Sequence, residues 1–101
     1  MGFFSNILPN KSGDLRKFIE EGAVIVDVRT VQEYNSGHIK GSKNIPLDSL
    51  MQKIEEVRKY NKPVITICQS GMRSGTARSI LEAKGIKVMN GGSWTALNRI
   101  L

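Results

Sequence analysis

Cysteine, histidine and aromatic residues are scarce in this chain of 101 residues, which contains one Cys, one His and 6% aromatics. A single cysteine excludes an internal disulfide. One cysteine and one histidine also fall short of the ligand set of a structural zinc site, so we expect no bound metal. Because aromatic side chains are so few, the core has to be mostly aliphatic.

Long apolar runs and clusters of basic residues are missing as well. No stretch approaches the ~20 apolar residues of a transmembrane helix, and the apolar part of residues 1–9 is too short for a signal-peptide core. The formal net charge of +6 favours anionic partners in general, but Lys and Arg are scattered along the chain. We therefore expect no membrane and no nucleic-acid partner, and we expect the cytoplasm, where a lone thiol stays reduced.

The length and composition suit one compact domain. The hydrophobic fraction is 40% and the charged fraction 24%, as in soluble globular proteins and unlike disordered chains. We find no internal repeat, low-complexity segment or linker. We therefore expect residues 1–101 to form a single domain and a monomer.

Short apolar runs alternate with helical patterns along the chain. Residues 23–28 and 63–68 form β-branched runs almost unbroken by polar residues, which is typical of strands buried on both faces of a parallel sheet. Weaker strand signals lie at residues 86–89 and 42–45. Apolar residues at helical spacing predict helices over residues 14–21, 48–60, 74–84 and 93–101. The sequence thus predicts an α/β domain with a mainly parallel central sheet and helices on both faces.

The sequence also predicts which face of one helix is buried and where a further short helix begins. The predicted helix over residues 48–60 has an apolar face that includes Met51. Thr30 and Glu33 have capping-box spacing, which predicts a short helix after the first buried strand.

The lone cysteine, Cys68, ends the second buried run and precedes a short loop and a helix that begins near Arg73 or Ser74. Ligands bind at the C-terminal ends of parallel strands, so the thiol lies at the reactive end of its strand. Backbone N–H groups of the loop, the positive end of the helix and Arg73 all favour thiolate over thiol, and Gly71 permits the tight curl. A drop of about two units from an ordinary pKa of about 8.5 would raise the thiolate fraction at pH 7 from about 3% to about three-quarters.

A structural cysteine beside an ordinary strand-to-helix turn is the competing interpretation of this segment. Here a buried strand, a cysteine, a glycine and an arginine occur together in the order that a reactive thiol requires. This combination favours a functional thiol.

Motifs along nearly the whole chain resemble the rhodanese-like family. Residues 27–29 (DVR) with 33–34 (EY) look like its first signature, and residues 37–46 (GHIKGSKNIP) closely match a second. Residues 68–74 resemble its active-site loop, and residues 91–94 (GGSW) resemble its C-terminal signature. The motifs follow one another in the order of the family, which makes the match specific.

This resemblance implies a rhodanese-like fold and a sulfurtransferase that requires no cofactor. Cys68 would take a sulfane sulfur from thiosulfate or a persulfide or polysulfide donor, hold it as a persulfide, and pass it to a thiol or cyanide acceptor. Backbone donors of the loop would form the substrate cradle, and Arg73 would also bind the anionic group of the donor. The substrate-binding residues would be Gln69, Ser70, Gly71, Met72, Arg73 and Ser74.

Other residues of the matching motifs receive weaker assignments. Asp27 and Arg29 match positions near the strand-end cleft, where they would orient the loop or only support the strand end. His38 lies in a segment that is a structural loop in the family, and a thiolate favoured by its cradle needs no general base. We expect Trp94 to pack in the core near the cleft. Gln69 stands where many relatives carry a basic residue, which predicts weaker binding of doubly charged thiosulfate.

Functions of other classes fit parts of the pattern. Cysteine phosphatases of the cell-cycle type and arsenate reductases have a longer loop between Cys and Arg, whereas only residues 69–72 separate Cys68 from Arg73 here. The tighter ring suits a sulfur atom better than a tetrahedral phosphate. Rhodanese-like domains also act as non-catalytic docking modules, often without the cysteine, or as relays that receive sulfur from a protein sulfur carrier. This chain keeps Cys68, which favours activity.

Overall fold

A four-stranded parallel sheet forms the centre of the molecule. The computed structural model describes residues 11–101, and the strand order in the sheet is β2-β1-β3-β4. The strands are β1 (Val24–Asp27), β2 (Lys43–Asn44), β3 (Val64–Cys68) and β4 (Val88–Ser93). Every pairing is parallel, so the predicted α/β class and strand direction are confirmed.

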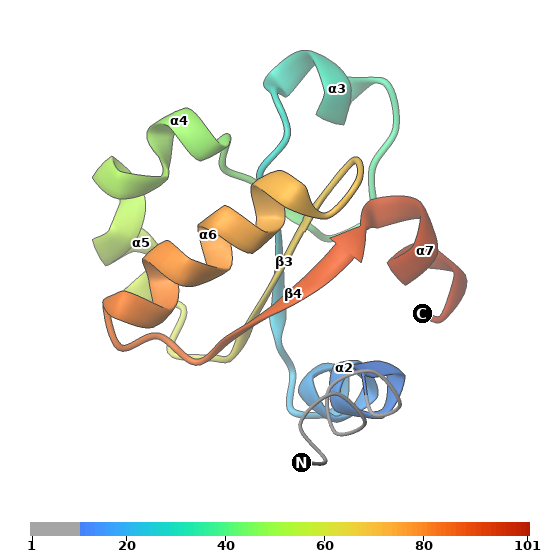
Figure 1. Cartoon of the computed structure of the whole chain (residues 1–101), viewed down its shortest axis with the longest axis horizontal. Coiled ribbons are helices and arrows are strands. Elements are labelled where there is room, and N and C mark those ends of the chain that lie inside the picture. Colours follow the sequence, from blue (N-terminus) through green and yellow to red (C-terminus); the bar gives the residue numbers. More distant parts are fainter. Residues whose placement is uncertain (1–10) are drawn as a thin grey trace, which may run out of the picture.

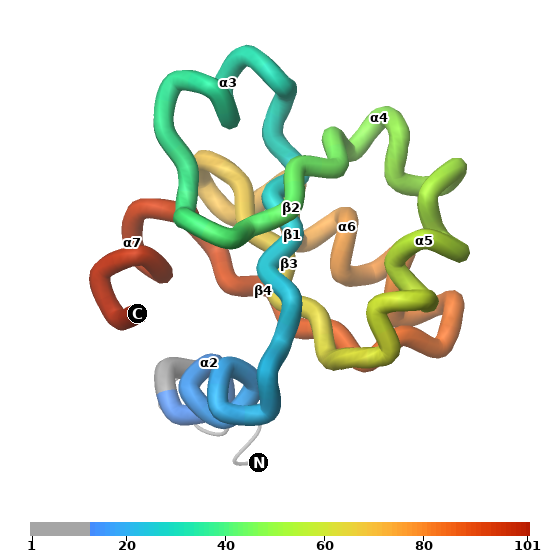
Figure 2. The backbone as a smooth tube through the Cα atoms, turned by 180° about the vertical axis from the view of Figure 1, so that it is seen from behind, coloured from blue at the N-terminus to red at the C-terminus, as the bar shows by residue number. Residues whose placement is uncertain are grey.

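Helices cover both faces of the sheet (Figure 1), as the sequence predicts. One face carries α4 (Leu47–Leu50), α5 (Ile54–Lys59) and α6 (Met72–Ala83), and the other carries α2 (Lys11–Glu20) and α7 (Trp94–Arg99). The view from behind in Figure 2 shows the same separation. The short helix α3 (Val31–Asn35) lies beyond the C-terminal ends of the strands, in the connection from β1 to β2.

Alternate residues of β3 divide the core into two clusters. Val64 and Cys68 pack toward α4, α5 and α6, whereas Ile65 and Ile67 pack toward α2 and α7. All residues of β3 are buried because helices cover the strand on both sides. The buried hydrophobic side chains of the described residues are aliphatic apart from Cys68, which confirms the expected aliphatic core.

The predicted helix over residues 48–60 is interrupted in the structure. A 3₁₀ turn, Met51–Lys53, separates α4 from α5. This turn winds more tightly than an α-helix, so the regular helical face is lost at this point. Met51 is 58% exposed, and its predicted place on the buried face is wrong.

Strand β4 begins later and extends further than the apolar run at residues 86–89 that predicts it. Residues 86–89 predict the strand, but β4 runs from Val88 to Ser93. The register with β3 shifts between Thr66 and Ile67, and the strand continues through Gly91 and Gly92. A Cβ atom at Gly91 would lie 2.6 Å from Cγ2 of Ile65, so glycine permits this close passage over β3.

The structure bears on the expected absence of a transmembrane helix, but not on the expected absence of a signal peptide. No helix within residues 11–101 combines the length and apolarity needed to span a bilayer. The expectation that residues 1–9 are not a signal peptide lies outside the described residues.

Candidate active site

Cys68 is the last residue of β3 and lies at the C-terminal end of the sheet. It is paired with Ser93 at the end of β4, and the preceding Ile67 is paired with Asp27 at the end of β1. Three strands therefore end beside the sulfur. The loop of residues 69–71 then leads into α6, and α3 lies on the same side of the sheet edge (Figure 1).

Backbone N–H groups of the loop and helix converge on the sulfur atom. The N–H of Gly71 donates to Cys68 Sγ at 3.0 Å, and the N–H of Ser74 donates at 3.4 Å. The hydroxyl oxygen of Ser74 lies 3.4 Å from Sγ. Gly71 is the N-cap of α6 and has a φ of 100°, a conformation that favours glycine. The 12-residue helix adds the positive end of its dipole to these donors.

Opposing effects set the pKa of the Cys68 thiol. Burial is the largest single influence and acts to raise the pKa, because it disfavours the charged thiolate. Hydrogen bonds from the Ser74 hydroxyl and from the N–H groups of Ser74, Gly71 and Ser70 act to lower it. Together these hydrogen bonds outweigh burial, so the pKa of Cys68 lies below its ordinary value.

The loop also covers the sulfur that it surrounds. Cys68 has 0% of its surface exposed, whereas Gln69 and Ser70 are exposed and Met72 is 81% exposed. The exposed side chains of the loop therefore lie outside the buried thiol. Residues 69–71 connect the end of β3 to the start of α6.

Arg73 directs its guanidinium to Glu33 of α3. The Nη1 and Nη2 atoms donate to the two carboxylate oxygens at 2.8 and 3.0 Å. This bidentate pair, with the N–H of Thr30 as a second donor, lowers the pKa of Glu33 to about 2. The same pair raises the pKa of Arg73. The guanidinium expected to bind a donor anion thus fastens the start of α6 to α3.

Asp27 and Arg29 form a buried ion pair at the end of β1. Asp27 is 0% and Arg29 2% exposed, and Arg29 Nη2 lies 2.7 Å from Asp27 Oδ2. Arg29 also donates to the carbonyl oxygens of Glu33 and Gly37, and its guanidinium carbon lies 4.7 Å from the ring centroid of Trp94. The pair holds α3 and the following loop in place. Its link to the cysteine loop runs through Glu33, which pairs with Arg73.

His38 packs against Tyr34 in the connection that follows α3. The two rings are stacked with centroids 3.7 Å apart, and His38 Nδ1 lies 2.7 Å from the carbonyl oxygen of Tyr34. Among the hydrogen bonds of the described residues, none joins His38 to Cys68. The geometry agrees with the structural interpretation of this histidine.

Asn90 and Glu33 contribute contacts that the sequence pattern does not predict. Asn90 of β4 accepts a hydrogen bond from the Ser74 hydroxyl at 2.7 Å and donates to the carbonyl oxygen of Gly71 at 3.1 Å. The only signal in the sequence is a polar residue directly before Gly91-Gly92. Glu33 is recognisable as a capping residue, and its capping box with Thr30 is present in the structure. Its pairing with a residue 40 positions later is not visible in the sequence.

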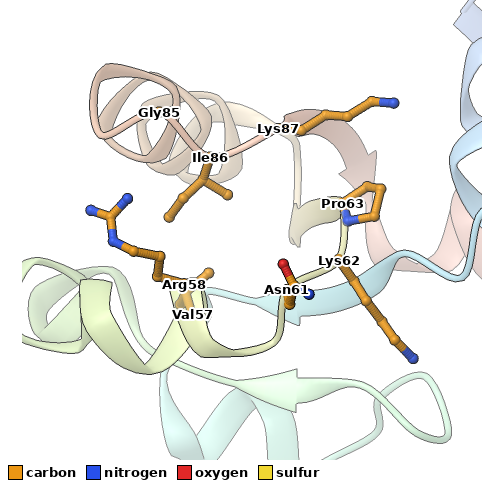
Figure 3. A pocket seen from close by; sticks show the side chains of 8 residues that line it. All are labelled: Val57, Arg58, Asn61, Lys62, Pro63, Gly85, Ile86 and Lys87. Carbon is orange, nitrogen blue, oxygen red and sulfur yellow. The ribbon is translucent and has the colours of Figure 1, made fainter.

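A cavity of about 310 Å³ lies at the opposite end of the strands (Figure 3). It borders the residues before β3 and β4, and its lining contains no thiol, hydroxyl or carboxylate. The side chains of Lys62 and Lys87 extend away from one another in Figure 3. The lining residues are Val57, Arg58, Asn61, Lys62, Pro63, Gly85, Ile86 and Lys87.

Comparisons with known proteins identify relatives of this chain. The sequence model of the rhodanese-like domain family matches residues 12–96. The chain is 33% identical over 85 residues to thiosulfate sulfurtransferase GlpE of Pseudomonas putida, which covers 84% of this chain and 74% of GlpE. It is 44% identical over 63 residues to YqhL of Bacillus subtilis, which covers 62% of this chain and about half, 49%, of YqhL.

A solved structure supports the same fold. The rhodanese-related protein of Thermoplasma volcanium superimposes with a TM-score of 0.73 at 28% sequence identity. The superposition covers 88% of this chain and 88% of that protein. The likeness therefore extends over most of the chain.

Proposed function

The chain belongs to the rhodanese-like domain family, and we propose that it is a sulfurtransferase that carries a transferable sulfur on Cys68 as a persulfide. The observation that carries this proposal is the pair of backbone N–H donors around Sγ, with the Ser74 hydroxyl beside them. N–H groups of Gly71 and Ser74 and the Ser74 hydroxyl surround a sulfur at the start of a helix. Such a cradle favours a thiolate nucleophile and, after loading, an anionic terminal sulfur.

In the first step, the Cys68 thiolate attacks the outer sulfur of thiosulfate. A new S–S bond forms to Sγ, the S–S bond of thiosulfate breaks, and sulfite leaves with the electron pair. A persulfide or polysulfide donor reacts in the same way and releases a thiolate. In the second step, a thiolate or cyanide acceptor attacks the terminal sulfur and restores the Cys68 thiolate. This is covalent catalysis in two half-reactions and needs no metal or organic cofactor.

The loop residues then have distinct roles. Gly71 and Ser74 hold the sulfur, while Gln69, Ser70 and Met72 form the outer surface that a donor meets first. Arg73 supports the anionic state by its charge while its guanidinium pairs with Glu33. Asp27 and Arg29 support the end of β1 and the position of α3. We assign the reaction to the cytoplasm because the thiol has to stay reduced to be loaded.

A sulfur relay between proteins is the second candidate within the same chemistry. It is favoured by Met72, which is 81% exposed directly beside the loop and offers an apolar contact to a protein partner. In this role a protein sulfur carrier, and not thiosulfate, would supply or accept the sulfur. Phosphatase activity is disfavoured for two reasons. The loop is short, and both terminal nitrogens of the Arg73 guanidinium donate to Glu33 and not to a phosphate.

Steady-state kinetics test the proposal. We expect the protein to form thiocyanate from thiosulfate and cyanide with parallel double-reciprocal plots, because sulfite leaves before cyanide reacts. Intersecting plots would contradict a covalent intermediate. Transfer from a small persulfide or polysulfide, with little from thiosulfate, would favour the relay.

A further inference from the structure

The hydroxyl group of Ser74 lies between two partners, Cys68 and Asn90. Ser74 Oγ is 3.4 Å from Cys68 Sγ and 2.7 Å from Asn90 Oδ1. Ser74 is fully buried, and the hydroxyl of Thr66 in β3 donates to its carbonyl oxygen at 2.9 Å. The backbone that carries this hydroxyl is therefore held in place, while the O–H group can rotate about the Cβ–Oγ bond.

The orientation of the Asn90 amide follows from its backbone partners. The N–H of Gly92 lies 2.9 Å from one end of the amide, and an N–H can only donate, so this end is the oxygen. The carbonyl oxygen of Gly71 lies 3.1 Å from the other end and can only accept, so that end is the NH₂ group. Asn90 Oδ1 is thus an acceptor, and the Ser74 hydroxyl has to donate to it.

A serine hydroxyl has one proton to donate. When this proton lies toward Asn90, Ser74 offers only lone pairs to Cys68, which is the arrangement that suits a protonated thiol donating to Ser74 Oγ. A thiolate needs donors instead, so the hydroxyl has to rotate toward Sγ and give up its bond to Asn90. Asn90 Oδ1 then keeps only the N–H of Gly92.

We propose that Asn90 is a positioning residue that acts on Cys68 through the Ser74 hydroxyl, holding its proton while Sγ is uncharged and releasing it to Sγ when the thiolate forms. The consequence for catalysis rests on the proposed function, because it concerns the persulfide of Cys68. In the persulfide the negative charge lies on the terminal sulfur, and Sγ, bonded on both sides, is again uncharged. The hydroxyl then returns to Asn90, which favours the loaded state over the bare thiolate.

The charged groups near the sulfur come from α6, α3 and β1. Arg73 of α6 is paired with Glu33 of α3, and Arg29 is paired with Asp27 at the end of β1. Within the part of the chain that the structure describes, no hydrogen bond joins these side chains to Sγ. From β4, the neutral amide of Asn90 faces the Ser74 hydroxyl. The competition for the hydroxyl proton is therefore local and can be measured against a constant background of charge.

A double-mutant cycle isolates this competition. The pKa of Cys68 is measured from the ultraviolet absorbance of its thiolate in four proteins: the wild type, Asn90→Ala, Ser74→Ala and the double variant, with Cys68→Ser as the blank. Asn90→Ala also removes the hydrogen bond to Gly71, but it does so in both backgrounds, so this effect cancels in the cycle. Thermal unfolding followed by circular dichroism verifies that each variant is folded.

We expect Asn90→Ala to change the pKa of Cys68 differently in the two backgrounds. When Ser74 is present, Asn90→Ala frees its hydroxyl to donate to the Cys68 thiolate without competition from Asn90. The change in the pKa of Cys68 should therefore be more negative, by about 0.5 to 1, than the change measured with alanine at position 74. Equal changes in both backgrounds would mean that Asn90 acts only by holding Gly71. A change of the opposite sign would mean that Asn90 aims the hydroxyl at the sulfur. Either of these results overturns the proposal.

Asn90→Asp provides a second variant that keeps the acceptor and strengthens it. Its charge acts on Cys68 in both backgrounds and cancels in the cycle, so the remaining difference should have the opposite sign to that of Asn90→Ala. A difference of the same sign would contradict the competition. These titrations need no sulfur donor, so a protein that shows the coupling but never forms a persulfide would refute the proposed function and leave this inference standing.

Discussion

The two ends of the parallel strands differ in what they offer a ligand. At the C-terminal end, Cys68 is fully buried, and N–H groups, a hydroxyl and a helix dipole surround its sulfur. At the N-terminal end lies a cavity of about 310 Å³ with an apolar floor that includes Val57 and Ile86. Its polar lining residues are the side chains of Arg58, Asn61, Lys62 and Lys87.

The end of the strands that has a cavity is therefore not the end that has the reactive thiol. The cavity end has room but no thiol, hydroxyl or carboxylate in its lining, and its two lysine side chains extend away from one another (Figure 3). The filled end, at Cys68, has a thiol with directed donors, and this thiol is fully buried. Catalysis depends on groups that stabilise charge where it develops, so we assign the chemistry to the filled end.

The largest expected effect separates the two ends directly. Cys68→Ser should abolish sulfur transfer, because a serine hydroxyl forms no persulfide and is not ionised at neutral pH. Lys62→Ala, at the cavity, should leave the rate of transfer unchanged. Both variants are assayed by thiocyanate formation from thiosulfate and cyanide. Loss of transfer in Lys62→Ala with a normal rate in Cys68→Ser would reverse the assignment.

The pair between Glu33 and Arg73 predicts a pH-dependent stability at the filled end. The folded-state pKa of Glu33 is lowered from 4.5 to about 2, so its stabilisation is present above about pH 4.5 and is lost as the pH falls toward 2. Glu33→Gln keeps a side chain that suits the capping box and removes the charge. At pH 6 this variant should melt a few degrees below the wild type, a small effect because the pair is about one-third exposed.

The difference in melting temperature should then narrow at low pH, because most of the stabilisation is lost by pH 2.5. Circular dichroism melts at pH 6 and pH 2.5 measure both proteins under the same conditions. A gap that stays constant between these pH values would show that the carboxylate charge does not contribute to stability. The capping box, which the glutamine side chain of the variant can still form, would then account for the role of this position.

The fold was predictable where its elements rest on local pattern. The buried runs at residues 23–28 and 63–68 appear as β1 and β3, because an unbroken apolar run suits a strand covered on both faces. The passage of β4 through Gly91 depends on close contact with Ile65 and Ile67, which lie far away in the sequence, and the apolar spacing of residues 48–60 contains no sign of the turn at Met51–Lys53. No spacing rule within a short window contains that information.

The candidate site divides in the same way. Cys68, Gly71 and Ser74 are predictable because strand end, loop and helix start follow one another in the chain. The partner of Arg73 was not predictable, since α3 reaches it only through the tertiary fold. Asn90 lies 16 residues beyond Ser74, on β4, and its contact depends on the pairing of β4 with β3, which places Asn90 opposite Thr66.

The smallest expected effect concerns the outer surface of the loop. Gln69 is exposed and uncharged where a donor anion arrives. Gln69→Arg should lower the KM for thiosulfate severalfold, because a positive charge attracts a doubly negative donor, and should change kcat little. Raising the salt concentration should reduce the difference from the wild type. An unchanged or higher KM would count against an approach over Gln69.

The central claim is that Cys68 holds a transferable sulfur, and intact mass spectrometry tests it most directly. The protein is incubated with thiosulfate, freed of excess donor and weighed with and without a thiol reductant, alongside Cys68→Ser. We expect a gain of one sulfur atom that the reductant removes and that the variant never shows. A mass gain with a polysulfide donor alone would keep the chemistry and change the donor. No gain with either donor would contradict the account and leave Cys68 a structural thiol in a docking module.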